Sequence, residues 1–157
     1  MNAVAIIARM MLTLDYLSEG RAFMGIGVGG TYPTEWEAAQ SDLHNRGKRT
    51  DEALVMIKKL WTEESVDFQG EHYSASGAQV APRPVQRPHP PLWVAGTSVE
   101  TMQLAARWDM MPITTGLLGA GGVRSHLTSF VQALKAEGKD YHRQITSWEI
   151  DRYLTLF

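Results

Sequence analysis

The sequence predicts an α/β fold, in which a parallel sheet is flanked by helices. Short apolar runs with strand character alternate along the chain with segments of helical periodicity, and parallel strands need such crossover helices. Three to four strand–helix units fit into the 157 residues, and no internal repeat is visible. Four units are about half of a (β/α)8 barrel of ~250 residues. The pattern by itself leaves half a barrel and a small open sheet as alternatives.

Four helices and a short helical entry are expected. Gly20 suits the left-handed residue that follows a helix, so it ends the first helix, and Gly138 closes the last one. Pro33 is suited to the first helical position of a short entry at residues 31–35. The helices are expected at residues 3–17, 46–61, about 99–107 and about 123–137. Their first apolar face comprises Val4, Ile7, Met11, Leu14 and Leu17, and the second comprises Ala53, Leu54, Ile57, Leu60 and Trp61.

Three strands of the main sheet and one hairpin are expected. Residues 82–91 carry five prolines, which predicts a stiff, extended connection with few backbone donors. The strands are expected at residues 22–28, 92–95 and 110–113, and the hairpin, outside the main sheet, at 66–68 and 72–73 around Gln69-Gly70-Glu71. Residues 116–122 contain four glycines and are expected to form a loop, whereas residues 145–157 receive no assignment.

Composition and charge exclude several functional classes. The formal net charge of -2 gives no electrostatic reason to expect binding to nucleic acid or to an anionic membrane. No cysteine is present, so disulfides, thiolate metal sites and cysteine nucleophiles are excluded. Arg9 and Asp15 interrupt the apolar beginning of the chain, which argues against a signal peptide, and no apolar run reaches the ~18 residues of a membrane span. We therefore expect a cytoplasmic protein.

A glycine-rich segment, Gly25-Ile26-Gly27-Val28-Gly29-Gly30, follows the first expected strand. It fits the G-x-G-x-x-G pattern of dinucleotide-binding folds, but Pro33 delays the next helix and no acidic residue ends a second strand at the required spacing. Two other interpretations remain. The glycines could merely permit a tight turn, or they could keep the end of the strand open for a flat ligand, which is the interpretation that we favour.

Gly96-Thr97-Ser98 stands between a strand that ends at Ala95 and a helix that begins near Val99. A helix start with free backbone amides, hydroxyl groups and a glycine for close approach is a good seat for a phosphate. The same residue types are also the ordinary caps of helices. The local sequence leaves both interpretations open.

Other patterns yield no catalytic residue. The five histidines are scattered without metal-ligand spacing, and no Gly-x-Ser-x-Gly elbow of a hydrolase is present. The tryptophans and methionines are expected in the core. The acidic pairs Asp51-Glu52 and Glu63-Glu64 are interpreted as solvated charges.

In order and spacing, several segments resemble the luciferase-like monooxygenase family, which includes flavin-dependent monooxygenases and deazaflavin-dependent reductases and dehydrogenases. The resemblance extends over residues 4–113. It is carried by residues 13–21 (TLDYLSEGR), 25–30 (GIGVGG), 46–54 (RGKRTDEAL), 60–62 (LWT) and 81–96 (APRPVQRPHPPLWVAG).

This resemblance implies an eight-stranded barrel with the flavin at the carboxyl ends of the strands. It places Gly27, Gly29 and Gly30 near the isoalloxazine ring and Gly96, Thr97 and Ser98 at the cofactor phosphate. The implied cofactor is FMN or the deazaflavin coenzyme F420, which would carry the redox chemistry on a small organic substrate.

The sequence departs from the family pattern in two ways. The family's first strands have no counterpart before Asn2 and its last strands have none after Phe157, so residues 1–157 are expected to form a single, incomplete barrel domain. Asp109-Met110 also replaces the family's usual Asp-Gly. An incomplete barrel has unpaired sheet edges, so we expect a homo-oligomer or association with a second chain. The resemblance implies a flavin- or deazaflavin-dependent oxidoreductase or monooxygenase of the luciferase-like class, and we expect this chain to be a fragment of the full enzyme that is active only if the barrel is completed. The alternatives are a non-catalytic flavin-binding or dimerisation module and a small nicotinamide-binding domain.

Overall fold

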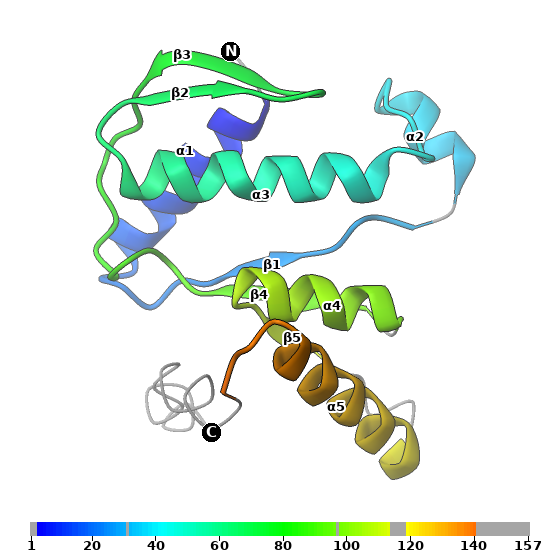
Figure 1. Ribbon diagram of the computed structural model, residues 1–157. Coiled ribbons are helices and arrows are strands. Elements are labelled where there is room, and N and C mark those ends of the chain that lie inside the picture. Colours follow the sequence, from blue (N-terminus) through cyan, green and yellow to red (C-terminus); the bar gives the residue numbers. More distant parts are fainter. Residues whose placement is uncertain (1–2, 31, 97, 114–118, 141–157) are drawn as a thin grey trace. The chain divides into compact units, whose positions relative to one another are not determined.

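The computed structural model describes residues 3–30, 32–96, 98–113 and 119–140, which belong to two compact units (Figure 1). The first unit contains the chain up to Met24 and Val28–Pro90. The second contains Gly25–Gly27 and the chain from Pro91 onward. The prediction of one incomplete domain over residues 1–157 concerns both units together and stays a prediction.

The first unit is built around two helices, α1 (Ala3–Leu17) and α3 (Arg46–Thr62), both predicted from the sequence. They pack against each other, and the indole N–H of the buried Trp61 donates to the carbonyl of Ala8 over 3.1 Å. This bond satisfies the polar end of a large aromatic side chain inside the core. The buried apolar residues of the two helices are Val4, Ala8, Met11, Leu12, Leu54, Met56, Ile57, Leu60 and Trp61.

The predicted apolar face of α1 is only partly the buried one. Val4 and Met11 are buried, but Ile7, Leu14 and Leu17 are 45, 56 and 71% exposed. The helix carries apolar residues on two sides, so periodicity alone does not decide which side faces the core. The side that is buried contains Asp15, whose carboxylate needs partners inside the unit.

Asp15 finds these partners in the proline-rich segment. It is 0% exposed, and its Oδ2 accepts the backbone N–H groups of Val85 (2.7 Å) and Gln86 (3.2 Å). The side-chain amide of Gln86 donates to Asp15 Oδ1 (2.8 Å) and to the carbonyl of Ala22 (2.7 Å). One buried carboxylate therefore ties α1, the chain that leaves it and the proline-rich segment together.

The predicted hairpin is present as a separate two-stranded antiparallel sheet. It consists of β2 (Val66–Gln69) and β3 (Ser74–Ala78), and Figure 1 shows it running along α3. The expected second strand at residues 72–73 is wrong, because β3 begins at Ser74. Residues 71–73 instead form a turn whose N–H groups point at one carboxylate.

That carboxylate belongs to Glu52 of α3, so its interpretation as a solvated charge is wrong. It accepts the successive backbone N–H groups of Glu71 (3.0 Å), His72 (2.9 Å) and Tyr73 (2.6 Å). Gly70 permits this approach, because a Cβ atom there would lie 2.0 Å from Glu52 Oε1. Glu52 thus fixes the turn of the hairpin to the helix.

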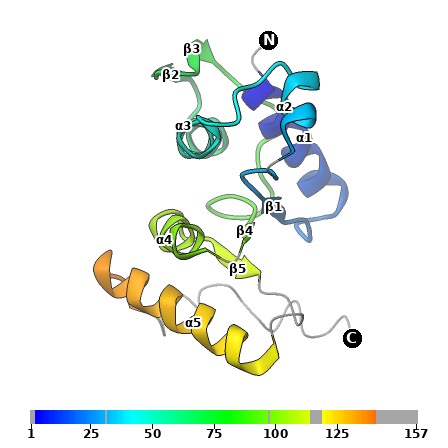
Figure 2. The same ribbon diagram turned by 90° about the vertical axis from the view of Figure 1, so that its right-hand side faces the viewer.

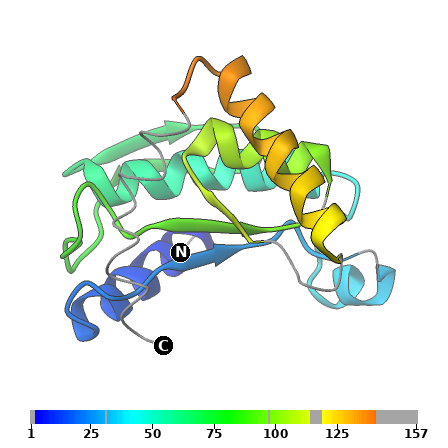
Figure 3. The same ribbon diagram turned by 90° about the horizontal axis from the view of Figure 1, so that it is seen from below.

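The second unit contains a parallel sheet with the strand order β1-β4-β5. Figure 3 shows β1 (Met24–Ile26) and β4 (Leu92–Ala95) side by side, and β4 pairs with β5 (Met111–Ile113) in the register Trp93↔Met111. The strand predicted at 92–95 is confirmed, and the strand predicted at 110–113 is present from Met111 onward. The first strand is shorter than the predicted 22–28.

Helices cover one face of this sheet. α4 (Val99–Trp108) packs on β4 and β5, and α5 (Gly119–Ala136) packs on α4 (Figure 2). Along β4 and β5 the buried residues are Leu92, Val94 and Pro112, whereas Ala95 and Ile113 on the opposite face are exposed. In the second unit, the sheet therefore has one covered and one open face.

The beginning of α5 corrects a further expectation. Residues 119–122 belong to the helix rather than to the expected loop, and residues 114–118 lie outside the described part. Glycine in a helix costs about 1 kcal/mol relative to alanine, and burial of Phe130, Ala133 and Leu134 offsets this cost. Gly138, with φ 67°, ends the helix as predicted. The unassigned residues 145–157 also lie outside the described part.

The start of one helix and the end of another are set by Pro33 and Asp109. Pro33 opens the helix α2 (Pro33–Ala38), as predicted. Asp109 ends α4 in the left-handed conformation, with φ 57°, and Lys139 Nζ donates to its carboxylate over 2.7 Å. Asp109 therefore fills a position that favours glycine, and β5 begins two residues later.

We expect Asp15→Ala to lower the free energy of unfolding by about 2–4 kcal/mol, because the buried Asp15 carboxylate is lost and the partly buried N–H donors of Val85 and Gln86 are left without this acceptor. Urea unfolding followed by circular dichroism measures this loss. Asp42→Ala is the control, since Asp42 is exposed and bonds only locally to His44 and Asn45. An equal loss in both variants would contradict the anchoring role.

Glu52→Gln should destabilise the chain at neutral pH by about 1 kcal/mol, since a charged acceptor of three N–H groups is lost. Burial raises the pKa of Glu52, but the N–H groups of Tyr73, His72 and Glu71 and the charge of His72 outweigh it, so this pKa is lowered. The stabilisation is therefore present above the unfolded pKa of about 4.3 and disappears as the pH falls through the folded pKa.

The melting temperatures of the wild type and the variant should converge below pH 4.3. Glu63→Gln is the control, because Glu63 makes only an exposed ion pair with Lys59. A difference that persists unchanged into acid would rule out the charged anchor.

Candidate functional site

The predicted cofactor contacts cluster where strands of the sheet end. Gly27 follows β1 and Gly96 follows β4, and these strands are parallel neighbours, so both glycines lie at the same edge of the sheet. Ser98 begins the helix that leaves this edge. Thr97 lies outside the described residues. Carboxyl ends of parallel strands are the usual position of ligand sites in α/β folds.

The end of β1 leaves room for a flat ligand. Ile26 is buried, whereas Gly25 and Gly27 are exposed on the other side of the strand. A Cβ atom added at either glycine would meet nothing within 4 Å. The backbone of β1 can therefore be approached closely, which a planar ring system requires.

Gly29 and Gly30 play a different part, because they form a turn that is covered by an aromatic side chain. A Cβ atom on Gly29, whose φ is +86°, would lie 2.6 Å from the ring of Trp36. The indole N–H of Trp36 donates to the carbonyl of Gly30 over 3.0 Å. The turn thus requires glycine for its backbone and for the ring that lies against it.

At the start of α4 the capping interpretation is confirmed for Ser98. Its Oγ accepts the backbone N–H of Thr101 over 3.2 Å and lies 3.2 Å from the Thr101 hydroxyl. Gly96 allows the Thr101 side chain to approach, since a Cβ atom there would lie 2.5 Å from Thr101 Oγ1. A cap does not exclude a phosphate, because other N–H groups of a first helical turn lack partners within the helix.

A negative charge already stands in this first turn. The pKa of Glu100 is lowered by a hydrogen bond from its own backbone N–H and by one from the Ser98 side chain. The carboxylate of Glu100 therefore uses the donors that a phosphate would use. Any anion at the start of α4 competes with this side chain.

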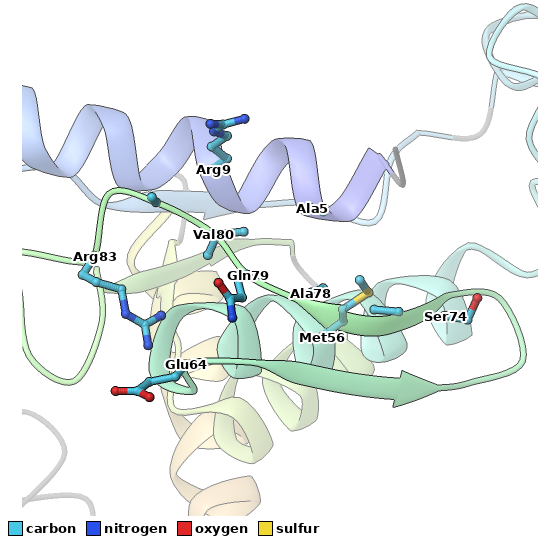
Figure 4. Close-up of a pocket in the computed structure, with 11 residues that line it drawn as sticks. Ala5, Arg9, Met56, Glu64, Ser74, Ala78, Gln79, Val80 and Arg83 are labelled. Carbon is cyan, nitrogen blue, oxygen red and sulfur yellow. The ribbon is translucent and has the colours of Figure 1, made fainter.

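A groove of about 780 Å³ within the first unit lies elsewhere (Figure 4). It lies beside α1, α3 and β3, and Met56, Ala75 and Ala78 are among its lining residues. The side chains of Arg9 and Arg83 point in opposite directions in Figure 4, so they do not converge on one ligand group. The groove shares no residue with the predicted cofactor contacts, and we assign it no chemistry.

Metal sites and membrane-spanning helices are both absent from the described residues. No three histidine, aspartate or glutamate side chains there form a group that could hold a metal ion. Likewise, none of the described helices combines the length and the apolar character of a membrane span.

Comparison with known proteins identifies related chains. The profile of a family described as luciferase-like monooxygenase matches residues 1–146. Monooxygenase RslO1 from Streptomyces bottropensis superimposes with a TM-score of 0.77 at 26% identity, over 88% of this chain and 43% of that protein.

Two further solved structures extend the comparison. The oxygenating constituent of 3,6-diketocamphane monooxygenase from Pseudomonas putida, in complex with FMN, gives a TM-score of 0.72 at 23% identity. An F420-dependent secondary alcohol dehydrogenase, in complex with an F420-acetone adduct, gives 0.66 at 23%. Each is covered to 42%, over 88% of this chain. The chain thus spans less than half the length of these proteins, and the predicted fold class, part of a (β/α)8-type barrel, is confirmed.

Ser98→Ala should lower the free energy of unfolding by about 1 kcal/mol, because the Thr101 N–H loses its capping acceptor. Thermal unfolding measures the effect. Ser125→Ala within α5 is the matched control, since Ser125 is exposed and alanine is the better helix former. If both variants were equally stable, Ser98 would not act as a cap.

Proposed function

Because the chain belongs to the luciferase-like monooxygenase family, we propose that it supplies the cofactor-binding part of an oxidoreductase that uses FMN or the deazaflavin coenzyme F420. The family match covers most of the chain, since it extends over residues 1–146. The proposed substrate is a small organic molecule. We further propose a soluble, cytoplasmic protein that forms a homo-oligomer or associates with a second chain.

One observation carries this proposal. Gly27 and Gly96 end neighbouring parallel strands at one edge of the sheet, and open space surrounds the missing Cβ of Gly27. A flavin ring is flat and wide, so it needs a strand end without side chains. The open end of β1 fits such a ring.

The phosphate of the cofactor is proposed at Gly96, Thr97 and Ser98. Ser98 begins α4, and the partial positive charge of a helix start attracts anions. Glu100 weakens this seat by its own negative charge. The end of β4 therefore suits the cofactor phosphate, whereas the Glu100 carboxylate at the start of α4 repels it.

The flavin itself would supply the redox chemistry. The residues of this chain would bind it and orient it: Gly27 by leaving the strand end open, Gly29 and Gly30 by the shape of the following turn, and Ser98 by holding the helix start. None of these groups is an acid or a base. Proton transfer is therefore assigned to no residue of this chain.

A second candidate is a flavin-binding module without catalysis of its own. It is favoured by the same observation, namely that the proposed contacts consist of glycines and hydroxyl residues. The nicotinamide alternative is weakened by the turn at Gly29 and Gly30, which packs against Trp36 instead of opening a helix towards a pyrophosphate.

The test is a fluorescence titration of the full chain with FMN, riboflavin and coenzyme F420. We expect saturable binding of FMN or F420, with a dissociation constant on the order of micromolar. A folded chain that binds neither cofactor would contradict the proposal. Turnover of a reduced cofactor by the same sample would separate the enzyme from the module without catalysis.

Glu100→Gln tests the phosphate seat within the same titration. Removal of the competing charge should tighten FMN binding about two- to fivefold. Riboflavin lacks the phosphate, so its affinity should not change. Glu137→Gln, in the exposed segment after α5, is the matched control. An equal gain for FMN and riboflavin would remove the phosphate from this helix start.

A further inference from the structure

We infer that Trp36 is a positioning residue that sets the shape of the Gly29–Gly30 turn and thereby the affinity for the cofactor. The inference rests on the proposed function, which puts this turn beside the flavin ring. Trp36 lies on α2, a helix in which no residue is buried. Its ring and its indole nitrogen both contact the turn.

Two independent contacts fix the turn. The ring of Trp36 lies so close to Gly29 that a Cβ atom there would be 2.6, 3.1 and 3.6 Å from three of its carbons. The indole N–H holds the carbonyl of Gly30 at 3.0 Å. The first contact restricts the position of the turn, and the second restricts the orientation of the Gly30 peptide plane.

Without such contacts the turn would be loose. Gly29 and Gly30 have the widest range of backbone conformations of any residue type, and ordering one residue costs roughly 1–2 kcal/mol. A ligand that binds beside an unordered glycine turn must supply this ordering itself. Trp36 supplies it in advance, which is the physical basis of preorganisation.

The anchoring of Trp36 is local. The backbone carbonyl of Tyr32 accepts the N–H of Glu35 over 3.2 Å, and the backbone carbonyl of Trp36 accepts the N–H of Ser41 over 3.0 Å. The indole therefore projects from a short helix whose two ends are both tied. Its own position does not depend on a deep core, so the side chain can be changed without unfolding the first unit.

The test compares the wild type with Trp36→Phe and Trp36→Ala in the flavin titration. Phe keeps a ring over Gly29 but lacks the donor to Gly30, so the cofactor should bind about fivefold more weakly. Ala removes both contacts, and the affinity should fall about tenfold or more. Trp108→Phe, at the end of α4, is the matched control and should bind like the wild type.

Hydrogen exchange measured by NMR gives a readout without cofactor. The indole N–H of Trp36 should exchange more slowly than a free indole, and the carbonyl carbon resonance of Gly30 should shift in both variants relative to the wild type, because its hydrogen bond is lost. Circular dichroism confirms that the variants remain folded. A freely exchanging indole N–H, or an unchanged Gly30 carbonyl resonance, would overturn the inference.

The two proposals fail in different ways. A wild type that binds no flavin contradicts the proposed function. Equal flavin affinity in the wild type, Trp36→Phe and Trp36→Ala contradicts only the role of Trp36.

Discussion

The first unit depends on the burial of one carboxylate, that of Asp15. A segment with five prolines in ten residues has few N–H groups to offer, and two of them, on Val85 and Gln86, are used by this side chain. A buried charge is tolerated only when hydrogen bonds surround it. The same bonds place one side of α1 in the core and hold the proline-rich segment against this helix.

Much of the fold could be predicted from the sequence, because helical periodicity and glycine or proline boundaries are local signals. α1, α3 and β4 lie where these signals put them. The predictions are wrong where a contact with a residue distant in the sequence determines the local structure. The buried side of α1 depends on Val85 and Gln86, and the start of β3 depends on Glu52 of α3.

For the candidate site, sequence patterns indicated the positions but not the contacts. The sequence does not distinguish a glycine that leaves open space for a ligand, as at Gly27, from one that makes room for a neighbouring side chain, as at Gly29. The contact of Trp36 with Gly30 has a spacing of six residues and follows no helical or strand period. The position of Glu100 weakly indicates its contacts, since an acidic residue in the first turn of a helix interacts with the N–H groups of that turn.

The division into units has a consequence for synthesis on the ribosome. β1 belongs with β4, yet the whole of Val28–Pro90 is made between them. At about 5–20 residues per second, the nascent strand waits roughly 3–13 s for its partner. During that interval α1, α3 and the hairpin can complete their own packing. The first unit is therefore expected to pack before the sheet of the second unit forms, and β1 is the part that a chaperone would meet unpaired.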